Sequence, residues 1–119
     1  MRILIVEDET AAYENLADML VTIDPTLEIM GNTESVQQTV RWLQANPRPD
    51  LIFMDIHLSD GSAFAIFDQI EVEAPIIFTT AYDQYAIDAF KVNSIDYILK
   101  PIKSEELKRA LDKFSRWNH

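Results

Sequence analysis

Five short apolar runs alternate with five segments in which apolar residues recur at helical spacing, and this alternation limits the fold more than any other feature. The apolar runs are residues 3–6, 27–32, 51–54, 76–78 and 97–99. The helical segments are residues 10–23, 34–45, 62–71, 84–92 and 104–114. Strands that alternate with helices form a parallel sheet covered on both faces. The sequence therefore predicts an α/β fold, an open doubly wound sheet of five strands with five helices.

The size and composition of the chain exclude several classes of protein. A chain of 119 residues without an internal repeat or linker predicts one domain over residues 1–119. The absence of cysteine excludes disulfides, thiolate nucleophiles and cysteine-bound metals. The apolar runs are too short for a membrane span or a signal peptide, so we expect a cytoplasmic protein that makes no membrane contact.

The acidic residues are distributed unevenly. Residues 1–99 carry 17 acidic and four basic side chains, a balance of −13, whereas the whole chain has a net charge of −10. A surface of this sign repels the phosphate backbone, so we do not expect this domain to bind nucleic acid by itself. The excess acid is either solvated surface or, in part, a site for a cation.

Polar residues follow the ends of four predicted strands. Right-handed crossovers place the carboxyl ends of all the strands at one edge of the sheet, where ligands of such folds bind. The residues that collect there are Glu7, Asp8, Asp55, Thr80 and Lys100. Three carboxylates repel each other unless a cation lies between them, and Mg²⁺ prefers such oxygen ligands. An aspartate can also be a nucleophile that forms an aspartyl-phosphate, with a lysine and a hydroxyl to neutralise the phosphoryl oxygens.

Each of these residues also has an ordinary interpretation. The acids at 7–9 suit a solvated helix start, and Asp60-Gly61 suits a plain turn. Thr80 fits a strand because it is β-branched, and Lys100 fits an exposed loop. A site is favoured because all of these residues fall at one edge of one sheet.

Several segments together resemble the receiver domain of two-component response regulators, over essentially the whole chain. These are residues 3–9, 51–55 with Asp60-Gly61, 76–81 and 97–101. The resemblance implies a flavodoxin-like sheet with the strand order 2-1-3-4-5. It also implies that a sensor histidine kinase transfers a phosphoryl group to Asp55 in the presence of Mg²⁺.

The resemblance assigns the ion ligands. Glu7 and Asp8 match the acidic pair that holds Mg²⁺ together with Asp55, and the backbone carbonyl of His57 is expected to be a further ligand. Glu7 replaces the aspartate found in many receivers, and its longer side chain is expected to reach the ion through water. Ser59 stands where a proline is frequent before Asp-Gly, which is expected to loosen that turn.

The resemblance also assigns the residues of the conformational switch. Thr80 matches the hydroxyl that moves to the phosphoryl group, and Lys100 matches the lysine that pairs with it. Tyr97 matches the aromatic residue that turns inward when the threonine moves. The peptide bond between Lys100 and Pro101 is expected to be cis. His57 and Tyr82 occupy positions that tune the phosphoryl lifetime in the family, or are simply a histidine and an aromatic residue of loops.

Residues 80–102 are similar to receivers that precede a LytTR-type DNA-binding domain. This similarity implies a transcription regulator that contacts DNA only through an output domain absent from these 119 residues. The switch would then change the face formed by residues 84–92, 97–99 and 104–114. A homodimer surface on that face could include Tyr85, Ile87, Lys91, Ile95 and Arg109. The apolar residues among them also fit ordinary core positions.

Other functions remain to be weighed. A Mg²⁺-dependent phosphatase with an aspartyl nucleophile needs a second carboxylate where this chain has His57, and it also needs a substrate cap. A nucleotide-binding fold is disfavoured because Gly31 and Gly61 form no phosphate-binding motif. A stand-alone receiver that acts through protein–protein contacts stays open, whereas a pseudo-receiver that serves only for docking is disfavoured by the intact set of Asp55, Thr80 and Lys100. We expect no enzyme activity beyond self-directed phosphotransfer and autodephosphorylation.

Overall fold

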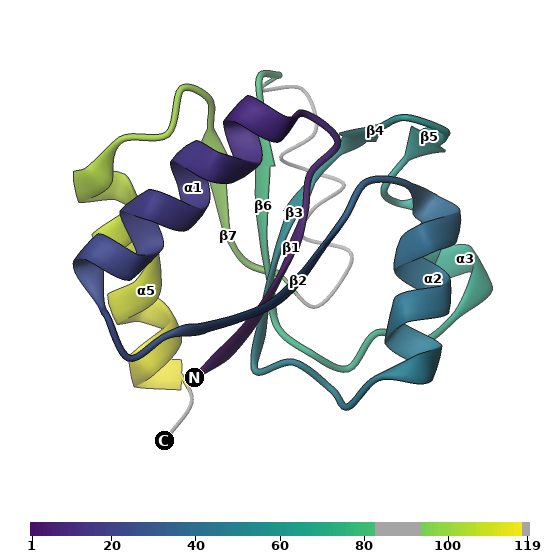
Figure 1. Ribbon diagram of the computed structural model, residues 1–119, viewed down its shortest axis with the longest axis horizontal. Coiled ribbons are helices and arrows are strands. Elements are labelled where there is room, and N and C mark those ends of the chain that lie inside the picture. Colours follow the sequence, from purple (N-terminus) through teal and green to yellow (C-terminus); the bar gives the residue numbers. More distant parts are fainter. Residues whose placement is uncertain (83–93, 118–119) are drawn as a thin grey trace.

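The computed structural model describes residues 1–82 and 94–117 (Figure 1). The helix predicted for residues 84–92 lies outside the described residues, together with Tyr85, Ile87 and Lys91. The side chain of Ile95 lies outside them as well, whereas Arg109 is described and exposed. The homodimer surface expected from these residues therefore stays a prediction.

A five-stranded parallel sheet forms the centre of the molecule. Its strands are β1 (Arg2–Val6), β2 (Glu28–Thr33), β3 (Leu51–Asp55), β6 (Ile76–Thr80) and β7 (Ser94–Leu99). They lie in the order β2-β1-β3-β6-β7, with parallel pairing throughout. Counted along the chain, these five strands have the order 2-1-3-4-5, so the predicted flavodoxin-like topology is confirmed.

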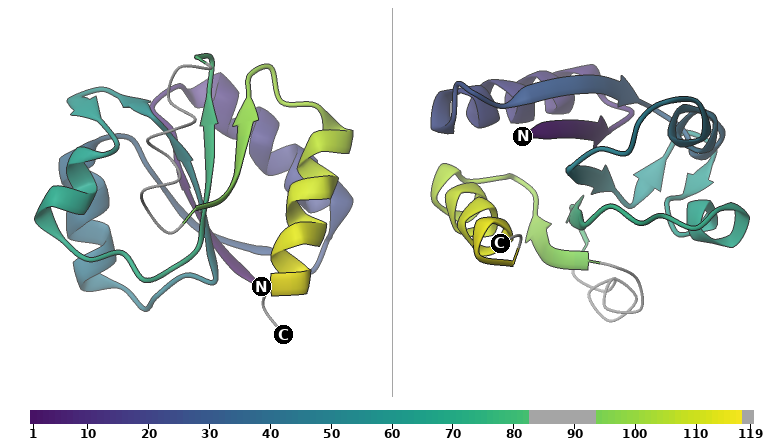
Figure 2. Two further views of the ribbon diagram at one scale, coloured as in Figure 1. Left: turned by 180° about the vertical axis from the view of Figure 1, so that it is seen from behind. Right: turned by 90° about the horizontal axis from the view of Figure 1, so that it is seen from below.

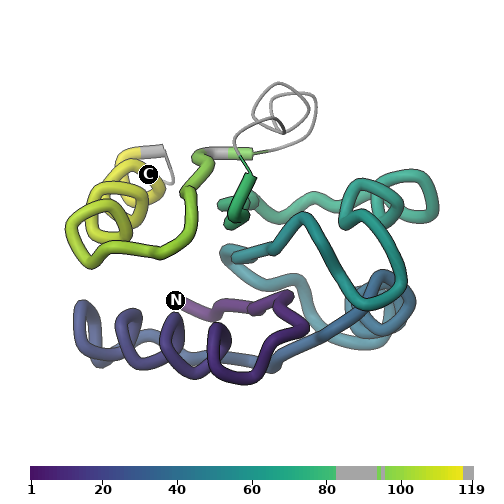
Figure 3. Tube along the Cα trace, turned by 90° about the horizontal axis from the view of Figure 1, so that it is seen from above, coloured from purple at the N-terminus to yellow at the C-terminus, as the bar shows by residue number. Residues whose placement is uncertain are grey.

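Helices cover both faces of this sheet, as Figures 1 and 2 show. One face carries α1 (Thr10–Ile23) and α5 (Ser104–Trp117), and the other carries α2 (Val36–Ala45) and α3 (Ala65–Gln69). Figure 3 shows the two helix layers from above, on either side of the strands. No helix among the described residues has the length and apolar character needed to cross a membrane.

Alternate residues of each strand enter different cores. In β1, Ile3 and Ile5 pack with Leu20 of α1 and Leu107 of α5, whereas Leu4 joins the cluster that includes helices α2 and α3. All five residues of β3 are buried, which is the pattern of a central parallel strand. This burial fixes the position of the strand whose last residue is Asp55.

The predicted third helix is shorter than expected. It spans Ala65–Gln69 rather than residues 62–71 because the preceding residues form a small antiparallel hairpin, β4 (His57–Leu58) and β5 (Gly61–Ser62). Gly61 has a φ of 140°, which favours glycine over residues with a side chain. The predicted turn at Asp60-Gly61 is therefore the tip of this hairpin.

Candidate functional site

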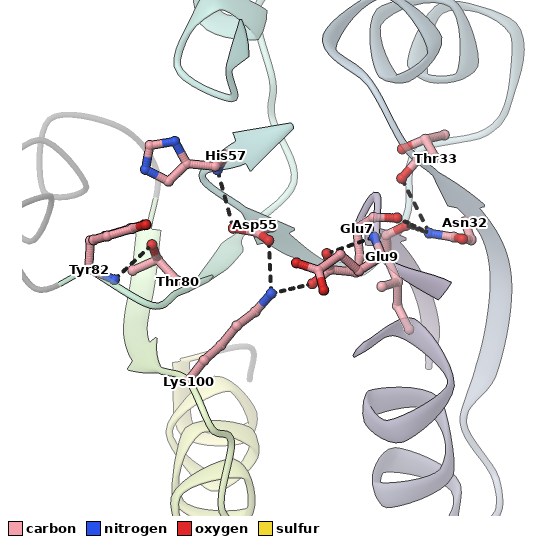
Figure 4. A network of polar contacts seen from close by, with 10 residues as sticks. Glu7, Glu9, Asn32, Thr33, Asp55, His57, Thr80, Tyr82 and Lys100 are labelled. Atoms are coloured by element: carbon pink, nitrogen blue, oxygen red, sulfur yellow. Dashed lines mark hydrogen bonds and ion pairs between the residues drawn. The ribbon is translucent and has the colours of Figure 1, made fainter. Parts of the chain in front are cut away.

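The predicted residues meet at the carboxyl edge of the sheet, as Figure 4 shows. Glu7 follows β1, Asp55 ends β3, Thr80 ends β6 and Lys100 follows β7. The peptide bond between Lys100 and Pro101 is cis, as expected. Parallel topology therefore brings together side chains that are far apart in sequence.

Lys100 bridges two carboxylates. Its Nζ donates to Oε1 of Glu7 at 2.6 Å and to Oδ2 of Asp55 at 2.8 Å. Both acids are buried, with exposed fractions of 4% for Glu7 and 6% for Asp55. Bonds between charged partners are the stronger class of hydrogen bond, so Lys100 holds these two strand ends together.

The pKa values of Glu7 and Lys100 are both raised, but for different reasons. Burial raises the pKa of Glu7, and repulsion by Asp55 adds to this, against the hydrogen bonds from Lys100 and from the backbone of Glu9. Burial alone would lower the pKa of Lys100, but its hydrogen bonds to Asp55 and Glu7 outweigh burial and raise it. The lysine is therefore firmly protonated, and Glu7 takes up a proton more readily than an exposed glutamate does.

The three predicted carboxylates can hold a metal ion. One carboxylate oxygen each from Glu7, Asp8 and Asp55 lies within 4.8 Å of the other two. Three ionised carboxylates and one lysine leave two negative charges uncompensated, which matches a divalent cation. The ligands are all oxygen atoms, so the residues fit Mg²⁺, which prefers carboxylates and water.

The site adjoins a cavity at the protein surface. This cavity has a volume of about 410 Å³ and is lined by Asp8, Glu9, Asp55, His57, Leu58, Ala81, Tyr82 and Lys100. A small molecule can therefore reach Asp55 from the side that carries Asp8 and Lys100.

Tyr82 connects the two residues predicted to form the switch. Its backbone N–H donates to Oγ1 of the fully buried Thr80 at 3.2 Å. Its carbonyl accepts a hydrogen bond from the hydroxyl of Tyr97, whose ring packs against the apolar cluster on the α2 and α3 face. Thr80 and Tyr97 are thus linked through one peptide segment.

His57 contributes its backbone and its ring in different ways. Its N–H donates to Oδ1 of Asp55 at 3.2 Å. Its ring meets the ring of Tyr82 edge to face, with 5.0 Å between the centroids and an interplanar angle of 76°. The sequence placed both residues near the site, but nothing in it indicated that their rings are in contact.

Two further polar residues hold the loops of the site, and sequence reasoning missed their roles. Asn32, at the end of β2, donates from Nδ2 to the carbonyls of Ile5 and Glu7, both at 3.1 Å. Asp60 accepts backbone hydrogen bonds from the first turn of α2. An amide at a strand end and an aspartate in a turn were the only signals, and both are common in loops.

Known proteins are similar to this chain in sequence. The family model described as "Response regulator receiver domain" matches residues 3–112. The sensory transduction protein LytT of Enterococcus faecalis is 40% identical over 119 residues, which cover 98% of this chain and 48% of that protein. The transcriptional regulatory protein LytR of Staphylococcus aureus is 39% identical, over 95% of this chain and 46% of its own length. The chain thus spans about half the length of these curated relatives.

Solved structures show the same fold. The response regulatory domain of mrkE from Klebsiella pneumoniae superimposes with a TM-score of 0.84 at 33% identity. The match covers 98% of this chain and 97% of that one. The N-terminal domain of a three-domain response regulator from Carboxydothermus hydrogenoformans gives a TM-score of 0.80 at 25% identity, over 98% and 95% of the two chains.

Proposed function

Because the chain belongs to the response regulator receiver domain family, we propose that Asp55 is its phosphoacceptor. Receiver domains of response regulators are phosphorylated by sensor histidine kinases and bind Mg²⁺ through an acidic pocket. The observation that carries the proposal is the placement of Asp55: its buried carboxylate ends the central strand, contacts Lys100 and lines an open cavity.

The proposed reaction is a phosphoryl transfer between side chains. A carboxylate oxygen of Asp55 attacks the phosphorus of a phosphohistidine on the kinase, so an O–P bond forms and the P–N bond breaks. The histidine nitrogen leaves with the electron pair of that bond and takes up a proton from solvent. Within this chain, the Asp55 carboxylate acts as the nucleophile, which is a known role for aspartate.

The ion site is proposed to consist of the carboxylates of Glu7, Asp8 and Asp55 and the backbone carbonyl of His57. A bound Mg²⁺ would offset negative charge on the phosphoryl oxygens. Lys100 already contacts Asp55, so a short movement of its ammonium can pair it with a phosphoryl oxygen. This arrangement supplies positive charge where the transfer adds negative charge.

The switch is proposed to run through the β6–β7 side of the site. If the Thr80 hydroxyl turns toward a phosphoryl oxygen, it gives up the hydrogen bond that it accepts from Tyr82. The segment at Tyr82 can then shift, and with it the partner of the Tyr97 hydroxyl. A local charge change thereby biases a two-state element. The edge-to-face contact of His57 and Tyr82 supports a role for both in limiting the access of water to the phosphoryl group, and hence in its lifetime.

The similarity to LytT and LytR supports a regulatory output beyond this domain. We propose that the whole protein is a cytoplasmic transcription regulator and that phosphorylation promotes its homodimerisation through the face near α5. DNA would be bound by a LytTR-type output domain. The domain itself would catalyse only its own phosphorylation and dephosphorylation.

Labelling of the purified chain tests the assignment of Asp55. With acetyl phosphate and Mg²⁺, the wild-type chain should gain one phosphoryl group by intact mass spectrometry, and Asp55→Asn should gain none. Asp68→Asn, on the exposed side of α3, is the matched control and should label normally. Undiminished labelling of Asp55→Asn would refute the assignment, and multiple-turnover hydrolysis of a phosphate monoester, rather than of the donor acetyl phosphate, would favour a phosphatase.

A further inference from the structure

The hairpin that follows Asp55 is fastened to the start of α2. Asp60, at its tip, accepts the backbone N–H of Val36 on Oδ1 at 2.6 Å and that of Gln37 on Oδ2 at 3.1 Å. These are two of the N–H groups that a helix leaves without an intrahelical partner at its first turn. A carboxylate is favoured there by both hydrogen bonding and the helix dipole.

A second residue of the tip makes contact with the same segment. The hydroxyl of Ser59 donates to the carbonyl of Glu34 at 3.2 Å, 25 residues away in the sequence. The base of the hairpin is closed by a hydrogen bond of 2.7 Å from the N–H of Ala63 to the carbonyl of Ile56. The loop that carries His57 is therefore held at both its base and its tip.

The α2 helix already has its own cap. Ser35 occupies the N-cap position, and its Oγ accepts the N–H of Gln38 at 3.0 Å. Asp60 is thus an additional partner for the helix end, supplied by a segment 24 residues away. The first turn of α2 therefore keeps the Ser35 cap without Asp60, whereas Asp60 ties the hairpin to this turn.

The hairpin position matters because the site uses the backbone of this loop. The N–H of His57 donates to Asp55, and the carbonyl of His57 is the proposed fourth ion ligand. The loop that carries Glu7 is held from the same side, since Asn32 in β2 donates to the Glu7 carbonyl. The end of β2 and the start of α2 therefore support both loops that bear the proposed ion ligands.

We propose that Asp60 is a positioning residue for the ion site, which it serves by locking the hairpin onto α2 so that the backbone of His57 stays fixed beside Asp55. The proposal rests on the proposed function, because it takes the ion ligands from there. Asp60 itself touches neither the ion nor the reacting atoms.

Matched variants separate positioning from simple helix capping. Asp60→Ala and Ser35→Ala each remove one cap from the same helix end, so both should lower the midpoint of urea unfolding. Only Asp60→Ala should raise the Mg²⁺ dissociation constant, by about tenfold, the usual effect of losing a residue that supports a metal ligand. Asp60→Asn keeps one acceptor oxygen and should recover part of the affinity. Calorimetric titration of the intact chain with Mg²⁺ alone measures the dissociation constant of each of the three variants.

Two outcomes overturn the proposal: an unchanged Mg²⁺ affinity in a folded Asp60→Ala, or an equal loss of affinity in Ser35→Ala. If Asp60→Ala does not fold, Asp60→Asn takes its place. An unchanged Mg²⁺ affinity in Asp60→Asn, or an equal loss of affinity in Ser35→Ala, then overturns the proposal. These readouts do not depend on labelling. Failure of Asp55→Asn to abolish phosphorylation would therefore refute the proposed function while leaving the Mg²⁺ comparison to judge Asp60.

Discussion

The Lys100 ammonium lies 2.6 Å from a carboxylate oxygen of Glu7, although 93 positions separate the two residues in the chain. It also donates to Asp55, so a single lysine is shared by two buried acids. Without an ion, Lys100 is the positive charge that allows these carboxylates to be buried side by side.

Replacing Lys100 by methionine should destabilise the metal-free protein by about 1–3 kcal/mol, because two buried carboxylates lose their charged partner. Mg²⁺ should then raise the melting temperature of Lys100→Met by more than that of the wild type, since the ion binds a more negative site in the folded state. Thermal unfolding with and without Mg²⁺ measures both effects. Lys103→Met, at an exposed position nearby, serves as control, and an equal response in both variants would contradict the role of Lys100.

Acid should remove the stabilisation that Asp60 gives to the hairpin. The hydrogen bond from the N–H of Val36, with a weaker one from that of Gln37, outweighs the opposing effect of desolvation and lowers the pKa of Asp60 below its ordinary value of 3.8. A depressed pKa in the folded state means stability that is present above pH 3.8 and is lost as the pH falls through the lower, folded value. Asp60→Asn should therefore be less stable than the wild type at pH 7.

The difference between the wild type and Asp60→Asn should shrink as the pH falls below 3.8, because Asp60 then becomes neutral in both states. Urea unfolding at a series of pH values measures the difference. Asp68→Asn, on α3, provides the comparison. A gap between the wild type and Asp60→Asn that stays constant through this range would rule out the charge of Asp60 as its cause.

Asn32→Ala should loosen the loop that carries Glu7. The variant removes the amide that donates to the carbonyls of Ile5 and Glu7, at a cost of about 1–2 kcal/mol in the free energy of unfolding. Asn32→Asp should cost more, because a carboxylate would face the carbonyl oxygens that the amide now binds. Urea unfolding tests the order, with Asn46→Ala as the control, since Asn46 donates to the carbonyl of Trp42 on the surface. Equal stability of Asn32→Asp and the wild type would contradict the assignment.

Tyr97→Phe should separate the switch from the phosphoacceptor. The variant keeps the ring but removes the hydroxyl that donates to the carbonyl of Tyr82, and should lower stability by about 0.5–1.5 kcal/mol. Labelling of Asp55 should continue, while phosphorylation-dependent changes in the NMR spectrum near Tyr82 should diminish. Tyr13→Phe, on α1, is the control. Loss of labelling in Tyr97→Phe would show that Tyr97 acts on the acceptor itself.

The sequence predicted the residues at the strand ends well because topology alone brings them together. Once the chain is divided into parallel strands, Glu7, Asp55, Thr80 and Lys100 must meet at one edge. The third helix was predicted too long, since its apolar spacing continues through residues whose backbone is taken up by the hairpin.

The contacts that hold the loops could not be predicted in this way. The bonds of Asp60 to α2 and of Asn32 to the Glu7 loop depend on where irregular backbone lies, and residue spacing does not report this. The ring contact between His57 and Tyr82 joins two segments that follow different strands, so the periodicity of apolar residues does not indicate it.

The strand order also has a consequence for biosynthesis. Glu7 follows β1 and Asp55 ends β3, and these neighbouring strands are made early, whereas Lys100 arrives just after the last strand. A growing chain that has already paired its first strands carries the acids without their lysine. The positive charge of Lys100 reaches the acids only when β7 has docked, so an intact Glu7–Lys100 bond marks a receiver whose sheet is complete.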